Sequence, residues 1–145
     1  LFIILIFSRC ETKINNILQQ DNQYINLMQH TKRGQIVNSL NTIALINATY
    51  LNPVLKNSKK IKESEIFIIG VYNSIDNREE NQSGIFNPNY SLTMNGSKWE
   101  KAEIANKNEL ELYNYPFYNK WMRYYKVYFP KTDENEIILT YKHKS

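Results

Sequence analysis

The segment 65–73, EIFIIGVYN, constrains the fold more than any other, because it is apolar at both sets of alternating positions. Successive side chains of a β-strand point to opposite faces of its sheet. A strand that is apolar on both faces is typical of the centre of a sheet that is buried on two sides. The sequence predicts such a strand here.

Two later segments alternate in the way expected of strands. The segment 90–94, YSLTM, predicts a half-buried strand. The dipeptide Asn95-Gly96 follows it, a strong signal for a hairpin turn, and 99–105 is expected to be the returning strand. Another strand is predicted over 121–129, with one face formed by Trp121, Arg123, Tyr125, Val127 and Phe129, and the other by Met122, Tyr124, Lys126 and Tyr128.

The remaining segments suggest a mainly β architecture. Short strands follow one another after residue 53, and the last is expected at 137–141, which favours an antiparallel sandwich. The polar segment 73–89 is expected to be a surface loop. The segment 36–51 suits one long strand, although a helix is the open alternative. Apolar residues at helical spacing predict an N-terminal α-helix within 11–31 that precedes the sandwich.

The chain opens with seven apolar residues, LFIILIF, followed by Ser8, Arg9 and the single cysteine, Cys10. This run is too short to cross a bilayer, but it matches the hydrophobic region of a signal peptide. With Cys10 directly after it, the segment is similar to a bacterial lipoprotein signal, in which the thiol receives a lipid. Arg9 departs from that pattern, which usually has a small residue there. The other two interpretations are a different membrane-targeting segment and a core strand followed by a buried free cysteine.

The sequence accordingly predicts three parts. These are the end of a signal peptide in 1–9, a lipid-bearing tether with the helix in 10–33, and the β-sandwich in 34–145. A chain of 145 residues is long enough for one such domain. Glu11 after the cysteine favours the periplasmic side of the outer membrane as the location, with inner-membrane anchoring as the alternative.

Four blocks support a family resemblance: ATYLNP (48–53), FIIGVYNSID (67–76), NPNYSLTMNG (87–96) and WMRYYKVYFP (121–130). They resemble blocks of small lipoproteins of Campylobacter and its relatives, which carry a variant immunoglobulin-like β-sandwich. The resemblance covers about residues 34–141. It implies export and an immunoglobulin-like fold, and it implies lipid attachment at Cys10, but it carries no catalytic residues over to this chain.

Candidate catalytic and metal-binding groups are sparse. His30 and His143 have no Cys or carboxylate at metal-ligand spacing, so neither a metal nor another cofactor is expected. Glu109 and Glu111 fall on one face of an expected strand, where they form either a carboxylate pair or, more simply, solvated charges. The net charge of +4 is spread along the chain, and acidic residues follow the basic run 56–62, so no nucleic-acid partner is expected.

Aromatic residues are concentrated in 113–129, where nine of seventeen residues are Phe, Trp or Tyr. A sandwich core needs fewer, so the surplus is a candidate for an exposed platform that binds a protein partner or a sugar ring. The simpler alternative is that the N-terminal helix covers this face of the sheet. The candidate binding surface consists of Tyr113, Tyr115, Tyr118, Tyr124, Lys126 and Tyr128.

Three hypotheses of function follow. The favoured one is a lipid-anchored protein of the cell envelope, held to the membrane through Cys10, that acts as a protein interaction module. The second is a glycan-binding module that uses the aromatic surface. The third, an enzyme such as a hydrolase, needs a cleft with convergent polar groups, and the sequence gives no sign of one.

Overall fold

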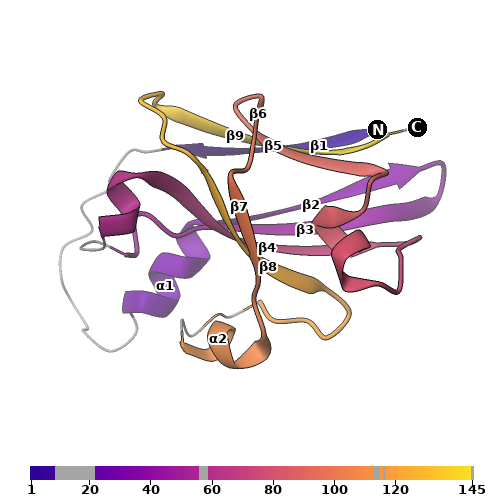
Figure 1. Ribbon diagram of the computed structural model, residues 1–145, viewed down its shortest axis with the longest axis horizontal. Helices are drawn as coiled ribbons and strands as arrows, with labels where there is room; N and C mark the ends of the chain where they lie inside the picture. The colour runs from indigo at the N-terminus through magenta and orange to yellow at the C-terminus, as the bar shows by residue number, and fades with distance from the viewer. Residues whose placement is uncertain (9–21, 56–58, 113–114, 116, 145) are drawn as a thin grey trace.

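The computed structural model describes residues 1–8, 22–55, 59–112, 115 and 117–144. Two antiparallel sheets face each other, as Figure 1 shows, so the expected mainly β architecture of two packed sheets is confirmed. The first sheet has the order β1 (Phe2–Ser8), β9 (Glu136–His143), β5 (Tyr90–Met94) and β6 (Ser97–Lys98). The second has the order β2 (Thr31–Asn38), β3 (Asn41–Tyr50), β4 (Ser64–Asn73), β8 (Arg123–Pro130) and β7 (Lys101–Ile104).

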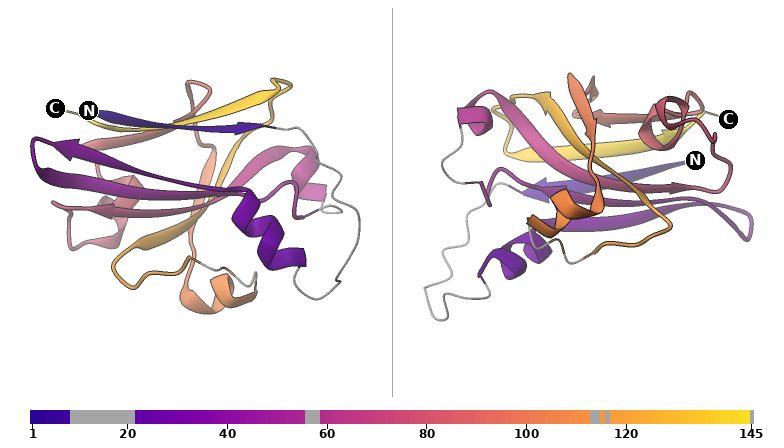
Figure 2. Two further views of the ribbon diagram at one scale, coloured as in Figure 1. Left: turned by 180° about the vertical axis from the view of Figure 1, so that it is seen from behind. Right: turned by 60° about the horizontal axis from the view of Figure 1, so that its bottom comes forward.

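Two α-helices, α1 (Asn22–Gln29) and α2 (Lys107–Leu112), lie on the five-stranded sheet, on the side away from the other sheet (Figures 1 and 2). Three short 3-10 helices, Lys59–Lys62, Glu80–Gln82 and Gly84–Phe86, lie in the connections. The main core fills the space between the sheets. Aromatic rings pack edge to face there, as between Phe7 and Phe67, whose centroids are 5.4 Å apart.

A second apolar cluster explains why β4 is apolar on both faces. Phe67, Ile69 and Val71 point into the main core, whereas Ile66 and Ile68 point the other way, into the second cluster. There they meet side chains from α1, α2, β8 and the connection between α2 and β8: Leu27, Leu110, Tyr115, Tyr124 and Tyr128. The prediction of a central strand at 65–73 is therefore confirmed.

The N-terminal run is a strand of the sandwich. Ile3, Leu5 and Phe7 of β1 are buried in the main core, and the strand pairs with β9 along its whole length. The predicted order, with a helix before the sandwich, is wrong, because the first strand starts at residue 2 and α1 follows it. The predicted boundary at residue 34 likewise does not separate a tether from the sheets.

Cys10 and the first part of the predicted helix lie outside the described residues. No helix among those that the structure describes is long and apolar enough to span a membrane.

The segment 36–51 forms strands and no helix, as expected, but it is not one strand. It belongs to a hairpin of β2 and β3, so the predicted extent of the strand was wrong. The chain turns at Ser39, whose φ of 57° is unusual for a residue with a side chain. The sequence there lacks the common Asn-Gly or Asp-Gly turn signal, which is why the pattern read as one strand.

The turn at Asn95-Gly96 is confirmed, since Met94 pairs with Ser97 across it. The expected return strand 99–105 is wrong, because β6 ends at Lys98 and the chain then crosses to the other sheet, where β7 pairs with β8. The segment 73–89 is also more than a surface loop. It buries Ile85 and Asn87, and its Asp76 carboxylate accepts hydrogen bonds from the Gly84 N–H (2.9 Å) and the Asn87 amide (2.9 Å).

Candidate functional site

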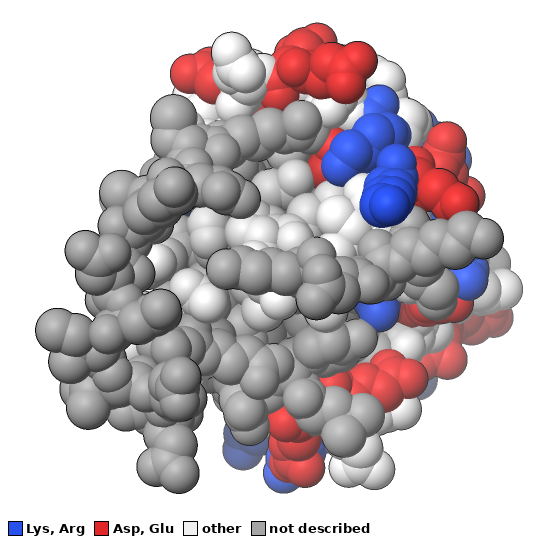
Figure 3. Space-filling view, turned by 90° about the vertical axis from the view of Figure 1, so that its left-hand side faces the viewer, with Lys and Arg blue, Asp and Glu red and all other residues white. Residues whose placement is uncertain are grey.

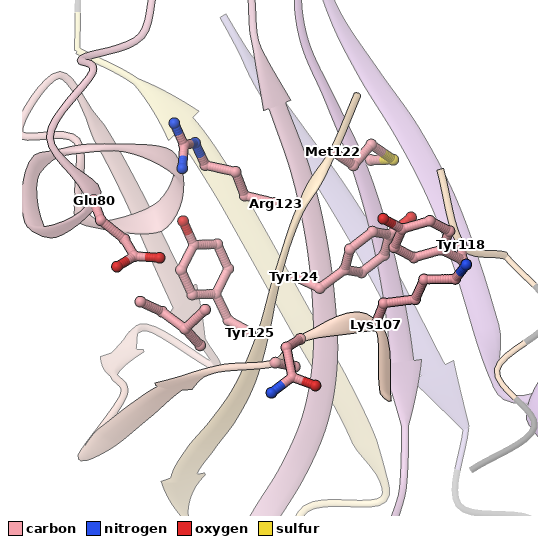
Figure 4. Close-up of a pocket in the computed structure, with 10 residues that line it drawn as sticks. Glu80, Lys107, Tyr118, Met122, Arg123, Tyr124 and Tyr125 are labelled. Atoms are coloured by element: carbon pink, nitrogen blue, oxygen red, sulfur yellow. The ribbon is translucent and has the colours of Figure 1, made fainter. Parts of the chain in front are cut away.

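A hollow of about 200 Å³ lies where β7 ends and β8 begins (Figure 4). It is formed by the loop with Glu80, the connection from β7 to α2, and the turn before β8. Glu80, Arg123 and Tyr125 lie on one side of the β8 ribbon in Figure 4, and Lys107, Tyr118 and Tyr124 lie on the other. The lining residues are Glu80, Ile104, Ala105, Asn106, Lys107, Tyr118, Met122, Arg123, Tyr124 and Tyr125.

The turn before β8 is held in place by Tyr124. The hydroxyl of this buried tyrosine donates to the Phe117 carbonyl (2.8 Å) and accepts from the Asn119 N–H (2.7 Å). Burial raises the pKa of Tyr124, so the hydroxyl keeps its proton and both hydrogen bonds at neutral pH. Tyr118 stacks on the same ring, with centroids 5.5 Å apart. One tyrosine thus fixes both the backbone of the turn and the exposed Tyr118 ring.

Exposed aromatic and basic side chains come together on this turn. Trp121 is 71% exposed, with the Lys120 ammonium 5.0 Å from its ring centre. Arg123 is also exposed, and its Nε lies 3.7 Å from a carboxylate oxygen of Asp76. At that distance and exposure the ion pair is weak, and the guanidinium can turn to another anion.

The start of α2 forms the other wall, and it corrects the prediction for Glu109 and Glu111. Both lie in this helix rather than on a strand. The Glu109 N–H donates to the Asn106 side-chain oxygen (3.0 Å), and the Asn106 N–H donates to the Glu109 carboxylate (3.1 Å). This is a reciprocal helix cap, whereas Glu111 lies 3.7 Å from Lys107. The two carboxylates therefore have separate structural roles.

The aromatic surface predicted from the sequence is mostly buried. Tyr115, Tyr124 and Tyr128 belong to the second apolar cluster, under Leu27 of α1 and Leu110 of α2. The alternative that a helix covers this face is therefore the correct one. Of the predicted surface, Tyr118 is exposed and Lys126 is partly exposed, with its Nζ 5.8 Å from the Tyr128 ring centre. Tyr113 lies outside the described residues.

Sequence reasoning missed Trp121 and Arg123 as surface residues. It placed them on the same strand face as Tyr125, Val127 and Phe129, which are in the core. The strand starts only at Arg123, so Trp121 precedes it, in the turn. The Asn119 side-chain oxygen accepts a hydrogen bond from the Trp121 N–H (2.9 Å), a local turn contact that Asn often makes. An Asn at this position was a signal in the sequence for a turn.

The hollow is lined by aromatic rings and by charged groups of both signs. Among the described residues, no three His, Cys, Asp or Glu side chains are grouped as metal ligands. The His143 ring packs beside the Tyr90 ring, with centroids 4.9 Å apart, on the four-stranded sheet, whereas the hollow lies on the five-stranded sheet. Charges elsewhere are mixed, and Figure 3 shows acidic and basic side chains next to each other at the edge of one face.

No family model, no curated protein and no solved structure matches the chain.

Proposed function

We propose that the protein is an interaction module that binds a partner protein at the hollow between the Trp121 turn and α2. The observation that carries this proposal is the exposure of Tyr118 and Trp121 in the turn before β8, and of Arg123 at the first residue of that strand. Trp, Tyr and Arg are the residue types that contribute most of the binding energy at protein interfaces.

The rigidity of the site supports the same function. The turn is fixed by the Tyr124 hydroxyl, and the facing helix starts at the Asn106–Glu109 cap. A surface that is ordered before binding loses less conformational entropy when a partner docks. The hollow has room for one side chain of the partner, and its Glu80 and Arg123 offer charges of both signs to the residues around it.

The proposed location in the cell envelope, on the periplasmic side of the outer membrane, rests on the N-terminal sequence pattern and on the family resemblance. The immunoglobulin-like type of the sandwich rests on the resemblance alone. Lipid attachment at Cys10 would produce a mature chain that starts at that residue and lacks β1. Because β1 is buried in the core and paired with β9, we propose that the mature protein keeps β1 and that Cys10 carries no lipid. Intact mass spectrometry of the exported protein tests this, since a chain that begins at a lipidated Cys10 would contradict it.

Site-specific photo-crosslinking tests the binding site. A photoreactive residue placed at Lys120, beside Trp121, is expected to crosslink one protein of an envelope fraction, and the same probe at Ile75 is not. Ile75 is the matched control because it is 82% exposed and does not line the hollow. Arg123→Ala is expected to abolish the crosslink from position 120. If the probes at positions 120 and 75 crosslinked the same protein in equal yield, the result would contradict the proposal.

A glycan is the second candidate ligand, favoured by the Tyr118 ring at the rim of the hollow. The chain has two tryptophans, and Trp99 packs against Phe86 in the partly buried edge of the core. A Trp99→Phe variant therefore leaves Trp121 as a fluorescent reporter. Saturable quenching by soluble envelope oligosaccharides that is lost in Tyr118→Ala would favour the glycan, and no response across a broad panel would exclude it.

A further inference from the structure

Strand β1 has an open edge. It is the end strand of the four-stranded sheet, and within the part of the chain that the structure describes β9 is the one strand that pairs with it. Figure 2 shows β1 along the margin of the molecule. The pairing runs without a register shift from Phe2 opposite Lys142 to Ser8 opposite Glu136.

The register determines which peptide groups face the open edge. The His143 N–H donates to the Leu1 carbonyl (3.3 Å), so these two residues form a hydrogen-bonded pair of the ladder. In antiparallel sheets such pairs alternate with pairs whose peptide groups point away from the partner strand. The N–H and C=O groups of Phe2, Ile4 and Ile6 therefore point away from β9, toward the open edge.

The side chains of the same three residues lie on the outer face of the sheet. Phe2 is 60% exposed, Ile4 49% and Ile6 50%, although all are apolar. Natural sheets protect their edges with charged residues, bulges or short strands, because an open apolar edge pairs with other chains. The other three edge strands have such protection, and β1, FIILIFS, has none. The protecting residues are Lys32 and Arg33 on β2, Lys98 on the two-residue β6, and Lys101 and Glu103 on β7.

We propose that β1 pairs with β1 of a second copy of this chain, antiparallel, about a two-fold axis at Ile4. In that register Phe2 lies opposite the partner's Ile6 and Ile4 lies opposite the partner's Ile4, so every outward pair is apolar. Each of these residues presents to the other copy the N–H and C=O groups that point away from β9 and that pair with no other described strand. The two four-stranded sheets then form one continuous sheet.

Charge at the ends of β9 favours this partner and this direction. Lys142 lies beside Phe2, whereas Glu136 lies beside Ser8 at the other end. Antiparallel pairing brings the basic end of each copy to the acidic end of the other, and parallel pairing would bring like charges together. These charges are about 16 Å apart, three strand spacings across the sheet and two residues along it. That exceeds the Debye length of about 8–10 Å at physiological ionic strength, so they add only a weak preference for this direction, and the apolar register supplies the affinity.

Sedimentation velocity of the full chain tests the dimer, in reducing buffer so that Cys10 forms no disulfide. Wild type is expected to be dimeric, and Ile4→Lys is expected to raise the dissociation constant by at least about 100-fold, because two ammonium groups would face each other. The control is Leu40→Lys, at a 99% exposed position in the β2–β3 turn, which should leave the dimer intact. Far-UV circular dichroism checks that both variants are folded.

Amide hydrogen exchange of the wild type gives a second test that needs no variant. Protection of the Phe2, Ile4 and Ile6 amides is expected to rise with protein concentration, while the Ile3 and Leu5 amides, which face β9, are protected at every concentration. A monomer at all concentrations would overturn the proposal. So would a dimer without protection at Ile4, which would indicate stacking of sheet faces, or a monomer that binds anionic vesicles through β1.

Discussion

Glu65 is a carboxylate with no exposed surface at the start of β4. It accepts hydrogen bonds from the Tyr50 hydroxyl (2.6 Å) and the Asn52 amide (2.8 Å), and Lys131 lies 3.2 Å away. A buried charge is tolerated in a fold only when it is paired and hydrogen-bonded in this way. The residue thus ties together β3, β4 and the segment after β8.

We predict that Glu65→Ala lowers the free energy of unfolding by about 1–3 kcal/mol. The change leaves the Tyr50 hydroxyl and the Asn52 amide without this acceptor in a buried place, which costs their desolvation. Urea denaturation measures the loss. The control is Glu63→Ala, two residues earlier in the turn before β4 and exposed, which should change stability by less than about 0.5 kcal/mol. Equal effects of the two changes would contradict the role of Glu65.

Three buried tyrosines predict how stability depends on alkaline pH. Burial raises the pKa of Tyr125 to about 12, and it also raises the pKa values of Tyr115 and Tyr141. In the unfolded chain these groups titrate near 10, so between pH 10 and 12 the folded state holds more protons. Stability is therefore fully present below pH 10 and falls as the pH rises toward 12.

The measurement is the thermal midpoint followed across the alkaline range, together with tyrosinate absorbance. Tyr125→Phe is expected to make the fall less steep, because it removes one of the groups with a raised pKa, although it also removes the hydrogen bond to the Ser83 carbonyl. If all eleven tyrosines titrated together near pH 10 while the circular dichroism stayed native, then Tyr115, Tyr125 and Tyr141 would not be buried in the folded protein.

At the scale of elements, β1 is the segment whose structure the sequence left most open. A run of seven apolar residues fits a signal peptide and a core strand equally well by composition. What distinguishes them is burial at alternate positions, and this depends on β9, which comes more than 120 residues later. The strands β4, β5 and β8 were predictable because their alternation is local to each segment.

A pair of matched substitutions tests whether β1 is a core strand. Leu5 is buried in the main core, and neighbouring Ile4 faces outward. Leu5→Ala is expected to lower the free energy of unfolding by about 2–5 kcal/mol, as do other buried truncations. Ile4→Ala should cost less than about 1 kcal/mol in dilute protein, where pairing between copies does not contribute. Two small effects would show that residues 2–8 do not belong to the folded domain.

At the scale of the whole molecule, the candidate site was predicted only in part, because its exposure depends on packing between distant elements. The sequence indicated more aromatic residues before and within β8 than the core between the sheets needs. In the structure the additional ones lie outside that core, in the second apolar cluster and in the exposed turn. The sequence left open whether a helix covers Tyr124 and Tyr128, because Leu27 comes from a helix almost a hundred residues earlier and Leu110 from a segment that was expected to be a strand. The exposed remainder, Tyr118 and Trp121, sits in the turn that these buried tyrosines support.

The molecule thus has a sandwich core and, outside it, a thinner layer of two helices. Among the described residues these helices have lengths of eight and six, and isolated helical segments shorter than roughly 12–15 residues are only marginally stable in water. They depend on a few contacts, such as those of Leu27, and on the bond from the Thr31 hydroxyl to the Leu27 carbonyl (2.6 Å). We expect this layer to open before the sandwich does.

Leu27→Ala tests that order of opening. It is expected to speed amide exchange in α1 by at least about tenfold, because the truncation removes more than 1.4 kcal/mol of burial, while β3 and β4 exchange as in wild type. The control is Ile25→Ala, on the exposed face of the same helix. If protection fell equally in α1 and the central strands, the helices and the sandwich would unfold as one unit. If α1 alone opened, Tyr124 and Tyr128 would gain exposure, and the aromatic surface indicated by the sequence would exist in that open state.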